Sequence, residues 1–413
     1  MTKPGRSTFG LVCLLVGLSV TSYFQRTSIS IAGPGMAREL GFTETELGSI
    51  YSAFLLGYTL LMIPGGSLAD RLGARRVLGL VAVATAVFTS ATALAGFGPL
   101  GGGSAAFLLL LIIRCALGVS TSPLYPAAAR MNSSRIPAKN RALVQGWIAA
   151  GAGIGGALSP FIFPLVIAGW SWRLAFVATG AATLVIAVIW FLVTRGDAPL
   201  SGTTQPQSWP RARWRSLLSN RQLILITLSY LATCYFEYIF FYWTYYYLGE
   251  IRHASAGQSA AFTSILFLAW MVLAPIGGFI SDALSTRQGG QQGRRLAPIL
   301  GLVLSAVAAV IALQLTNTMA TALMLAIALG LAAATDASFW VAAIEVGGSQ
   351  SGAAGGILNT GGNLGGLIAP ALTPWIAARY GWSESLYFGC FVVLVGAALW
   401  FVISPAKAAL DNV

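Results

Sequence analysis

Five ionisable side chains lie inside long apolar stretches of this sequence: Arg26, Arg114, Glu237, Asp336 and Glu345. A charged group in the hydrocarbon layer of a membrane costs about 2.5–3.5 kcal/mol or more, so each one needs a partner, an aqueous cavity or a function. The two basic residues lie in the first half of the chain and the three acidic residues in the second half. These residues are therefore the first candidates for chemistry.

The two arginines suggest a site for an anion. Arginine presents a planar fork of donors that matches a carboxylate, and it keeps its charge when it is partly dehydrated. We expect Arg26 and Arg114 to bind a small anionic solute. The alternative is that either arginine pairs with a carboxylate or with backbone carbonyl groups and only holds helices together.

The acidic residues suggest a site for a cation. Glu237 and Asp336 could bind and release a proton, or they could pair with the arginines when no anion is bound. We expect Glu345, near one end of its stretch, to pair with basic residues at the membrane surface.

Two pairs of uncharged polar residues are further candidates for contact with a ligand. Tyr238 and Tyr242, one helical turn apart in an aromatic-rich stretch, could offer hydroxyl groups to a polyhydroxylated ligand. Asn359 and Asn363, similarly spaced in a glycine-rich stretch, could offer amides to a ligand or to a sodium ion. The alternatives are an aromatic belt at the membrane interface and close helix packing.

The elements that position these residues are membrane-spanning helices. Of the 413 residues, 56% are hydrophobic and 9% are charged, whereas about a quarter of the residues of an ordinary soluble protein are charged. Runs of apolar residues long enough to cross a bilayer are apolar on every face, which argues against a barrel. We predict an all-α polytopic membrane protein with twelve spans, at 8–33, 46–69, 74–97, 104–127, 142–168, 173–194, 222–248, 258–283, 297–315, 319–345, 352–378 and 383–404.

The chain divides into two groups of six spans. We expect an N-terminal bundle over 1–194, a cytoplasmic linker over 195–221 and a C-terminal bundle over 222–413. Most of the 24 Lys and Arg residues fall in loops on one side, and the other side holds Arg38, Arg173, Arg252 and Arg379. Because basic loops stay in the cytoplasm, both termini are predicted to be cytoplasmic, as in a multi-pass protein of a bacterial-type inner membrane.

A loop motif occurs once in each half of the chain. GSLADRLGARR at 66–76 follows the second span, and a partial copy, GFISD at 278–282, follows the eighth. The first copy resembles the loop signature of the major facilitator superfamily. The resemblance implies two pseudo-symmetric six-helix bundles and a cytoplasmic latch, in which Asp70 lies near the start of the eleventh helix. The latch would include the ion-pairing residues Arg71, Arg75, Arg130 and Glu345.

Three stretches, at 23–30, 114–126 and 352–370, resemble the anion:cation symporter family, a branch that carries sugar acids and other organic anions. The resemblance implies that Arg26 binds substrate, that Tyr23 and Tyr58 flank it, and that Trp340 and Asn359 contribute from the second half. It implies a secondary transporter of a small organic anion, a sugar acid or other carboxylate, that is proton-coupled and works by alternating access.

The sequence departs from this family at two positions. Bacterial members commonly carry an acidic residue just before the first-helix arginine and another in the fourth helix, where this chain has Gln25 and the stretch VSTS at 119–122. Either coupling has moved to Glu237 or Asp336, with sodium as the alternative ion, or the protein is a uniporter or an exchanger. Efflux of a phosphorylated or amphipathic anion is a further alternative.

Other functions find little support in the sequence. His253 is the single histidine, and the four cysteines show no metal-ligand spacing. The sequence shows no nucleophile motif or phosphate-binding loop, so we do not expect an enzyme, a metal site or a cofactor. The net charge of +12 is accounted for by the inner loops, so we expect no nucleic acid as a partner. The expected partners are the anionic solute, the coupling ion and the lipid bilayer, and we expect a monomer.

Overall fold

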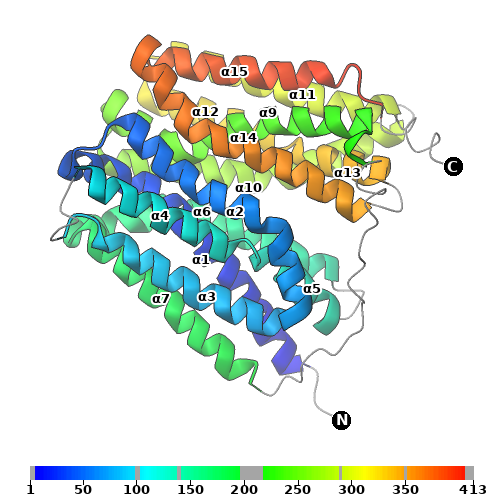
Figure 1. Cartoon of the computed structure of the whole chain (residues 1–413). Helices are drawn as coiled ribbons and strands as arrows, with labels where there is room; N and C mark the ends of the chain where they lie inside the picture. The colour runs from blue at the N-terminus through cyan, green and yellow to red at the C-terminus, as the bar shows by residue number, and fades with distance from the viewer. Residues whose placement is uncertain are drawn as a thin grey trace. The chain divides into compact units, whose positions relative to one another are not determined.

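The computed structural model describes residues 5–97, 103–136, 141–195, 217–287, 291–347 and 351–404, and every regular element in these ranges is a helix (Figure 1). Ten helical segments within them are long and apolar enough to cross a membrane. Each of the twelve predicted spans coincides with a helix or with two consecutive helices. The helices are α1 (Gly5–Leu40), α2 (Glu44–Leu72), α3 (Ala74–Ala91), η1 (Thr92–Leu94), α4 (Gly103–Thr121), α5 (Leu124–Arg135), α6 (Arg141–Gly169), α7 (Trp172–Val193), α9 (Arg221–Tyr246), η4 (Tyr247–Ile251), α10 (Ala256–Arg287), α11 (Gln291–Gln314), α12 (Thr318–Ala333), α13 (Asp336–Gly347), α14 (Ser351–Tyr380) and α15 (Trp382–Leu399).

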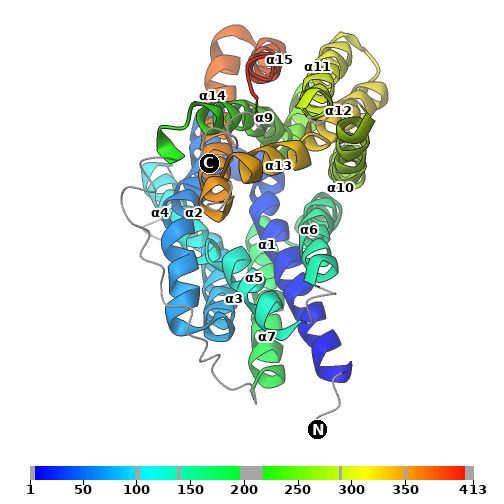
Figure 2. The same cartoon turned by 90° about the vertical axis from the view of Figure 1, so that its right-hand side faces the viewer.

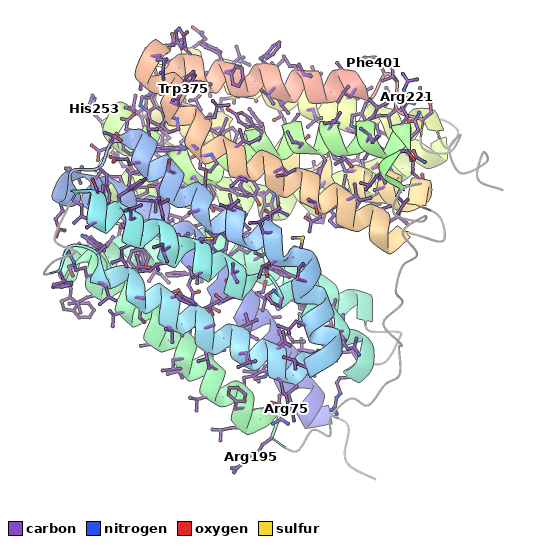
Figure 3. All side chains as sticks on the ribbon, viewed as in Figure 1. Arg75, Arg195, Arg221, His253, Trp375 and Phe401 are labelled. Atoms are coloured by element: carbon purple, nitrogen blue, oxygen red, sulfur yellow. The ribbon has the colours of Figure 1, made fainter. Side chains whose placement is uncertain are left out.

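The helices form two compact units, Met1–Gln207 and Ser208–Val413. The boundary lies inside the predicted linker, 195–221. Residues 196–216 are outside the described ranges, so the extent of the linker and its cytoplasmic location stay predictions. Within the first unit, Arg75 and Arg195 lie at the same end; within the second, Arg221 and Phe401 lie at one end and His253 and Trp375 at the other (Figure 3).

The two units share one pattern of helix pairing. In the first unit α1 packs along α6, α2 along α4, and α3 along α7 (Figures 1 and 2). In the second unit α9 packs along α14, α10 along α12, and α11 along both α12 and α15. In each unit, therefore, the first span pairs with the fifth, the second with the fourth and the third with the sixth. The internal repeat seen in the loop motif extends to the whole bundle.

Glycines allow the paired helices to approach each other closely. A Cβ atom on Gly118 of α4 would collide with the Phe54 carbonyl oxygen of α2, and one on Gly155 of α6 would collide with the Val20 carbonyl oxygen of α1. In the second unit, Gly365 of α14 faces the backbone of α9 in the same way. Small residues at these crossings let backbones pack together in a membrane, where helix association depends on close packing.

Two predicted spans are interrupted, which the sequence analysis did not anticipate. The fourth, predicted as continuous over 104–127, breaks at Ser122 and Pro123, because proline has no N–H group and its ring clashes with the preceding turn. The tenth, predicted over 319–345, breaks without a proline; Thr335 Oγ1 donates to the Ala332 carbonyl at 2.7 Å, which gives the backbone a local alternative to the helical bond.

The two breaks occupy equivalent places in the repeat. Gly65 of α2, beside the first loop motif, lies against Pro123, and Gly277 of α10, beside the second motif, lies against Ala334. The glycine just before the motif thus contacts the interruption in each unit. Interrupted helices in transporters expose helix ends and polar backbone groups inside the membrane, where ions and substrates bind.

Candidate anion site and buried carboxyl pair

Arg26 lies well inside α1 and is surrounded by aromatic rings. Its side chain is 6% exposed. The Cζ atom lies 5.3 Å from the ring centroid of Tyr23, 5.5 Å from that of Phe54 and 5.8 Å from that of Tyr58. Tyr23 precedes Arg26 by about one turn of α1, and Phe54 and Tyr58 lie one turn apart on α2 with stacked rings. The structure thus brings together three residues that the sequence assigned to one site, Tyr23, Arg26 and Tyr58.

A third tyrosine, which the sequence analysis missed, lies near this group. Tyr125, in the first turn of α5, places its hydroxyl oxygen 3.1 Å from Ser19 Oγ of α1, and Ser19 donates to the Ile148 carbonyl at 2.7 Å. Tyr125 is close enough to Tyr23, Tyr58 and Arg26 to interact with them electrostatically. The usable signal was its position between Pro123 and Pro126, which indicates an irregular backbone.

Arg114 is fully buried and contacts the main chain of α1. Its Nη2 donates to the carbonyl oxygen of Arg26 at 3.4 Å, and its Cζ lies 5.2 Å from the ring centroid of Phe54. In this position it braces α4 against α1 and α2. This contact with a backbone carbonyl is the one considered as the alternative role, and direct binding of substrate by Arg114 stays a prediction.

Gln25 faces a different neighbour from Arg26. Its Nε2 donates to Thr183 Oγ1 of α7 at 2.6 Å, and the side chain is buried. An amide at this position cannot take up a proton as a carboxylate would. Gln25 therefore acts as a polar contact between α1 and α7.

In the second unit, Glu237 of α9 and Asp336 of α13 lie close enough to interact electrostatically. Glu237 is 4% exposed. Within the described ranges, Glu237 Oε1 and Asp336 Oδ1 are buried without a hydrogen-bond partner. Asp336 is the first residue of α13, so the break in the tenth span positions its side chain.

Tyr230 and Trp340 lie beside the two carboxyl groups. Tyr230 is near enough to both Glu237 and Asp336 to interact electrostatically, and its hydroxyl is hydrogen-bonded to the side chain of Trp340. The indole can act only as the donor in that bond. The Trp340 ring lies against Gly355 of α14, where an added Cβ atom would come within 3.1 Å of it.

The remaining predicted residues of the second half lie along α9 and α14. The rings of Tyr238 and Tyr242 are 6.2 Å apart, and Tyr238 also packs against Gly366 of α14. Asn363 Nδ2 donates to the Asn359 carbonyl at 2.8 Å. Both tyrosines are buried. Their contact with a substrate, and that of the two asparagines, stays a prediction.

The predicted latch is described only in part. The side chains of Asp70 and Arg71 lie outside what the structure describes. Arg75 Nε donates to Thr194 Oγ1 at 3.1 Å, which ties the start of α3 to the end of α7. The ion pairs predicted for Arg130 and Glu345 stay predictions.

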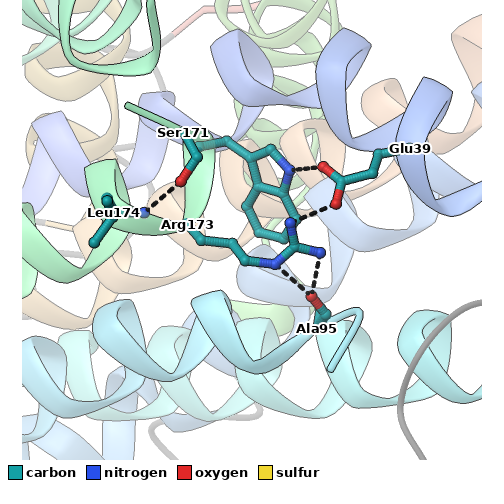
Figure 4. A network of polar contacts seen from close by, with 6 residues as sticks. Glu39, Ala95, Ser171, Arg173 and Leu174 are labelled. Carbon is teal, nitrogen blue, oxygen red and sulfur yellow. Dashed lines mark hydrogen bonds and ion pairs between the residues drawn. The ribbon is translucent and has the colours of Figure 1, made fainter. Parts of the chain in front are cut away.

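A polar network joins the ends of α1, α7 and the segment after α3, at the end of the first unit predicted to face outwards (Figure 4). Arg173 Nη1 lies 2.5 Å from Glu39 Oε1, and Trp172 Nε1 donates to Glu39 Oε2 at 2.6 Å. Arg173 Nε and Nη2 both donate to the Ala95 carbonyl, at 3.2 and 3.0 Å. This network fixes the end of the helix that carries Arg26.

No group of three or more His, Cys, Asp or Glu side chains within the described ranges is arranged to hold a metal ion. The arrangement instead offers an arginine with tyrosine hydroxyls nearby in the first unit, and a pair of carboxyl groups in the second.

Comparison with known proteins agrees with this geometry. The sequence model of the family described as the Major Facilitator Superfamily matches residues 15–290 of this chain. The chain belongs to this superfamily. Its members are transporters, so the expectation of a transporter and not an enzyme is confirmed, as is the fold class of twelve helices in two pseudo-symmetric bundles.

Relatives of known description come from the same branch of the superfamily as the sequence suggested. The chain is 27% identical to a probable sulfoacetate transporter of Cupriavidus necator, over 98% of this chain and 94% of that one. It is 28% identical to the hexuronate transporter of Bacillus subtilis, over 94% and 92%, and 28% identical to the D-galactonate transporter of Escherichia coli, over 97% and 96%. The resemblance to carriers of sugar acids and other organic anions is confirmed.

Solved structures show the same fold. A bacterial homologue of the human lysosomal transporter Spinster, in an inward-facing and unoccupied conformation, matches with a TM-score of 0.81 at 16% identity, over 99% of this chain and 98% of that one. A D-xylose-proton symporter matches with a TM-score of 0.76 at 15% identity, over 97% and 99%.

Proposed function

We propose that this protein is a secondary active transporter of a small organic anion, a sugar acid or another carboxylate, which works by alternating access and is coupled to protons. The observation that carries the proposal is the buried guanidinium of Arg26 among the rings of Tyr23, Phe54 and Tyr58. The relatives named above are described as a probable sulfoacetate transporter, a hexuronate transporter and a D-galactonate transporter, and each of these solutes bears a negative charge at neutral pH.

The chemistry of the site suits such an anion. A carboxylate or sulfonate accepts two parallel hydrogen bonds from one guanidinium, which are stronger than bonds between neutral groups. The hydroxyl groups of Tyr23, Tyr58 and Tyr125 can donate to or accept from the hydroxyl groups of a sugar acid. Low polarity around the aromatic rings strengthens the attraction between the anion and Arg26.

We further propose that the protein functions as a monomer in a bacterial-type inner membrane, with both termini in the cytoplasm. The bias of Lys and Arg towards one set of loops supports this orientation. Trp340, Asn359 and Asn363 are proposed to contribute to substrate binding from the second half.

Exchange of anions without a coupling ion is the second candidate. It is favoured by Gln25, which occupies the position just before Arg26 and donates to Thr183, so no carboxyl group at that position can carry a proton. Uptake into proteoliposomes separates the two. Acceleration by an inward proton gradient supports symport, and counterflow that the gradient leaves unchanged supports exchange.

Binding by the purified protein tests the role of Arg26. We expect Arg26→Ala to weaken binding of the preferred carboxylate by about 10- to 100-fold, since a hydrogen bond to a charged group contributes about 1.5–3 kcal/mol. Ligand-induced thermal stabilisation, measured over a panel of carboxylates and sulfonates, identifies the ligand and gives the affinity.

Arg38→Ala is the matched control, because Arg38 lies on the same helix and is exposed. It should bind the ligand as the wild type does. Unchanged affinity in a folded Arg26→Ala protein would contradict the assignment of the site.

A further inference from the structure

The membrane-spanning helices of the second unit carry acidic residues inside the membrane but no basic ones. The sequence has no Lys or Arg between 222 and 251, between 256 and 286, between 296 and 378, or between 382 and 404. The basic residues of these helices lie at helix ends: Arg221 begins α9, Arg287 ends α10, Arg294 and Arg295 lie near the start of α11, and Arg379 lies in the last turn of α14. The helices α12, α13 and α15 carry no Lys or Arg, so the sequence places no cation in the middle of a span beside Glu237 or Asp336. A buried carboxylate without a cation must be neutralised by a proton or by a bound ion.

The geometry gives the two carboxyl groups one common neighbourhood. Glu237 is 4% exposed and close enough to Asp336 to interact electrostatically, and one oxygen of each is buried without a hydrogen-bond partner in the described part of the chain. Two carboxylates at short range cannot both be ionised in a medium of low polarity, because their charges repel each other. Such a pair binds protons as a unit.

The other titratable groups near the pair come from α9. They are Tyr230 and Cys234, and both belong to the same electrostatic neighbourhood as the carboxyl groups. The titratable groups of the neighbouring helices α14 and α15 are Arg379, Tyr380, Glu384, Tyr387 and Cys390, and on α13 Glu345 lies nine residues beyond Asp336. On α10 the charged groups are Asp282 and Arg287, whose side chains lie outside the described set, and α12 carries none. On α11, which also packs against α13, they are Arg294 and Arg295, near its start.

We propose that Glu237, Asp336 and Tyr230 form one proton-binding site in the second unit, in which the two carboxyl groups share a single proton that couples to anion transport. The Tyr230 hydroxyl accepts a hydrogen bond from Trp340, so its own proton remains available to a carboxylate. Asp336 occupies the first turn of α13, where the helix dipole favours the ionised carboxylate. The shared proton therefore resides on Glu237.

The site would replace the carboxyl groups that bacterial relatives commonly carry at two positions of the first unit, where this chain has Gln25 and the uncharged stretch VSTS at 119–122. Gln25 is hydrogen-bonded to Thr183. The coupling role rests on the proposed function, whereas proton binding by the pair does not. The experiment therefore measures the proton first.

Infrared difference spectroscopy of the purified, reconstituted protein detects the proton directly. The carbonyl stretch of a protonated carboxylic acid in an apolar site is separate from that of exposed carboxyl groups. We expect the wild type to lose this band in two steps as the pH rises. The first deprotonation leaves a carboxylate whose negative charge disfavours ionisation of the second carboxyl group, which therefore loses its proton at a higher pH. Glu237→Gln and Asp336→Asn should each remove the later step, since one carboxyl group then titrates alone. Two independent variants cover the case in which one of them fails to fold.

Glu250→Gln is the control, since Glu250 lies at the end of the same span and is exposed; its spectrum should equal that of the wild type. A band that keeps both steps in Glu237→Gln would overturn the proposal. Loss of the band on addition of sodium chloride at constant pH would overturn it too, in favour of a sodium site.

Transport assays then test the coupling. Proton-driven uptake should lose its dependence on the imposed pH gradient in Glu237→Gln, and should keep it in Glu250→Gln. If the infrared titration behaves as expected but no carboxylate or sulfonate binds to the wild type, the proton site stands and the proposed function fails. If anions bind to the wild type but the infrared titration lacks the two steps, the proposed anion transport stands and the proton site fails.

Discussion

The guanidinium of Arg26 lies against three aromatic rings, and this environment suits a residue that must bind an anion reversibly. A cation over an aromatic ring gains about 0.5–2 kcal/mol. The rings hold the guanidinium in place without cancelling its charge, as a carboxylate would. Tyr23 and Tyr58 add hydroxyl groups at the edges of two of these rings, and Phe54 contributes only the ring.

This difference between the rings gives a prediction for Tyr58→Phe. The variant keeps the ring beside Arg26 and loses one hydroxyl group, so we expect the affinity for a hydroxylated acid such as D-galactonate to fall by about 3- to 10-fold, the equivalent of one hydrogen bond. Isothermal titration of the purified protein measures it. An unsubstituted short-chain carboxylate should bind equally to both proteins.

Tyr380→Phe is the control for Tyr58→Phe, because Tyr380 lies at the end of α14 and is 69% exposed. An equal loss of affinity for both acids would show that Tyr58 positions Arg26 and does not contact the sugar hydroxyl groups.

At the scale of helices, the sequence was a good guide to the spans and a poor guide to their interruptions. Apolar length is enough to locate a membrane helix, because the bilayer sets it. Proline alone does not mark a break: α2 continues through Pro64, and α6 continues through Pro160 and Pro164. The break at Thr335 has no proline at all. Tyr125 and Asp336 both lie just after an interruption. Because the interruptions were not predicted, neither residue was placed at the start of a helix.

The grouping of Tyr23, Arg26 and Tyr58 was predictable from the resemblance to the family. The proximity of Tyr23 to Arg26 also follows from their spacing of about one turn along a single helix. The neighbourhood of Glu237 and Asp336 was not, because it depends on how α13 is placed relative to α9 after the break. Sequence spacing has no information on contacts between residues so far apart in the chain.

The close crossing of α2 and α4 predicts the effect of Gly118→Ala. The new Cβ atom would meet the Phe54 carbonyl oxygen, which is backbone and cannot move away alone. We expect a loss of about 1–3 kcal/mol in unfolding free energy, as for other overpacked sites. Thermal unfolding in detergent measures it as a lower midpoint.

Gly17→Ala on α1 serves as the comparison, because a Cβ atom there would meet nothing within 4 Å. Its midpoint should equal or exceed that of the wild type, since alanine favours the helix. Equal midpoints for the two variants would contradict the close crossing.

At the scale of the whole molecule, the repeat appears at three levels: in the loop motif, in the pairing of helices and in the glycine that meets each interrupted span. The charges inside the membrane break this symmetry, because arginines lie in the first unit and carboxyl groups in the second. Each half of the repeat is thus suited to an ion of opposite sign.

The distribution of Lys and Arg predicts the orientation of the molecule. A fluorescent protein that folds only in the cytoplasm should be fluorescent when fused after the C-terminus, and alkaline phosphatase at the same place should be inactive. Both results should be reversed for fusions at Gly381, between α14 and α15. Active phosphatase at the C-terminus would show that the chain is oriented the other way.

The hydrogen bond from Arg114 to the carbonyl oxygen of Arg26 has a consequence for genetics. Replacing either arginine with alanine would stop uptake. Arg26→Ala removes the guanidinium that binds the anion, and Arg114→Ala removes the hydrogen bond that holds the main chain at Arg26. A screen for growth on a carbon source would score the two mutants alike. The two variants would differ in the yield of folded protein after purification. We expect this yield to fall for Arg114→Ala and to stay unchanged for Arg26→Ala.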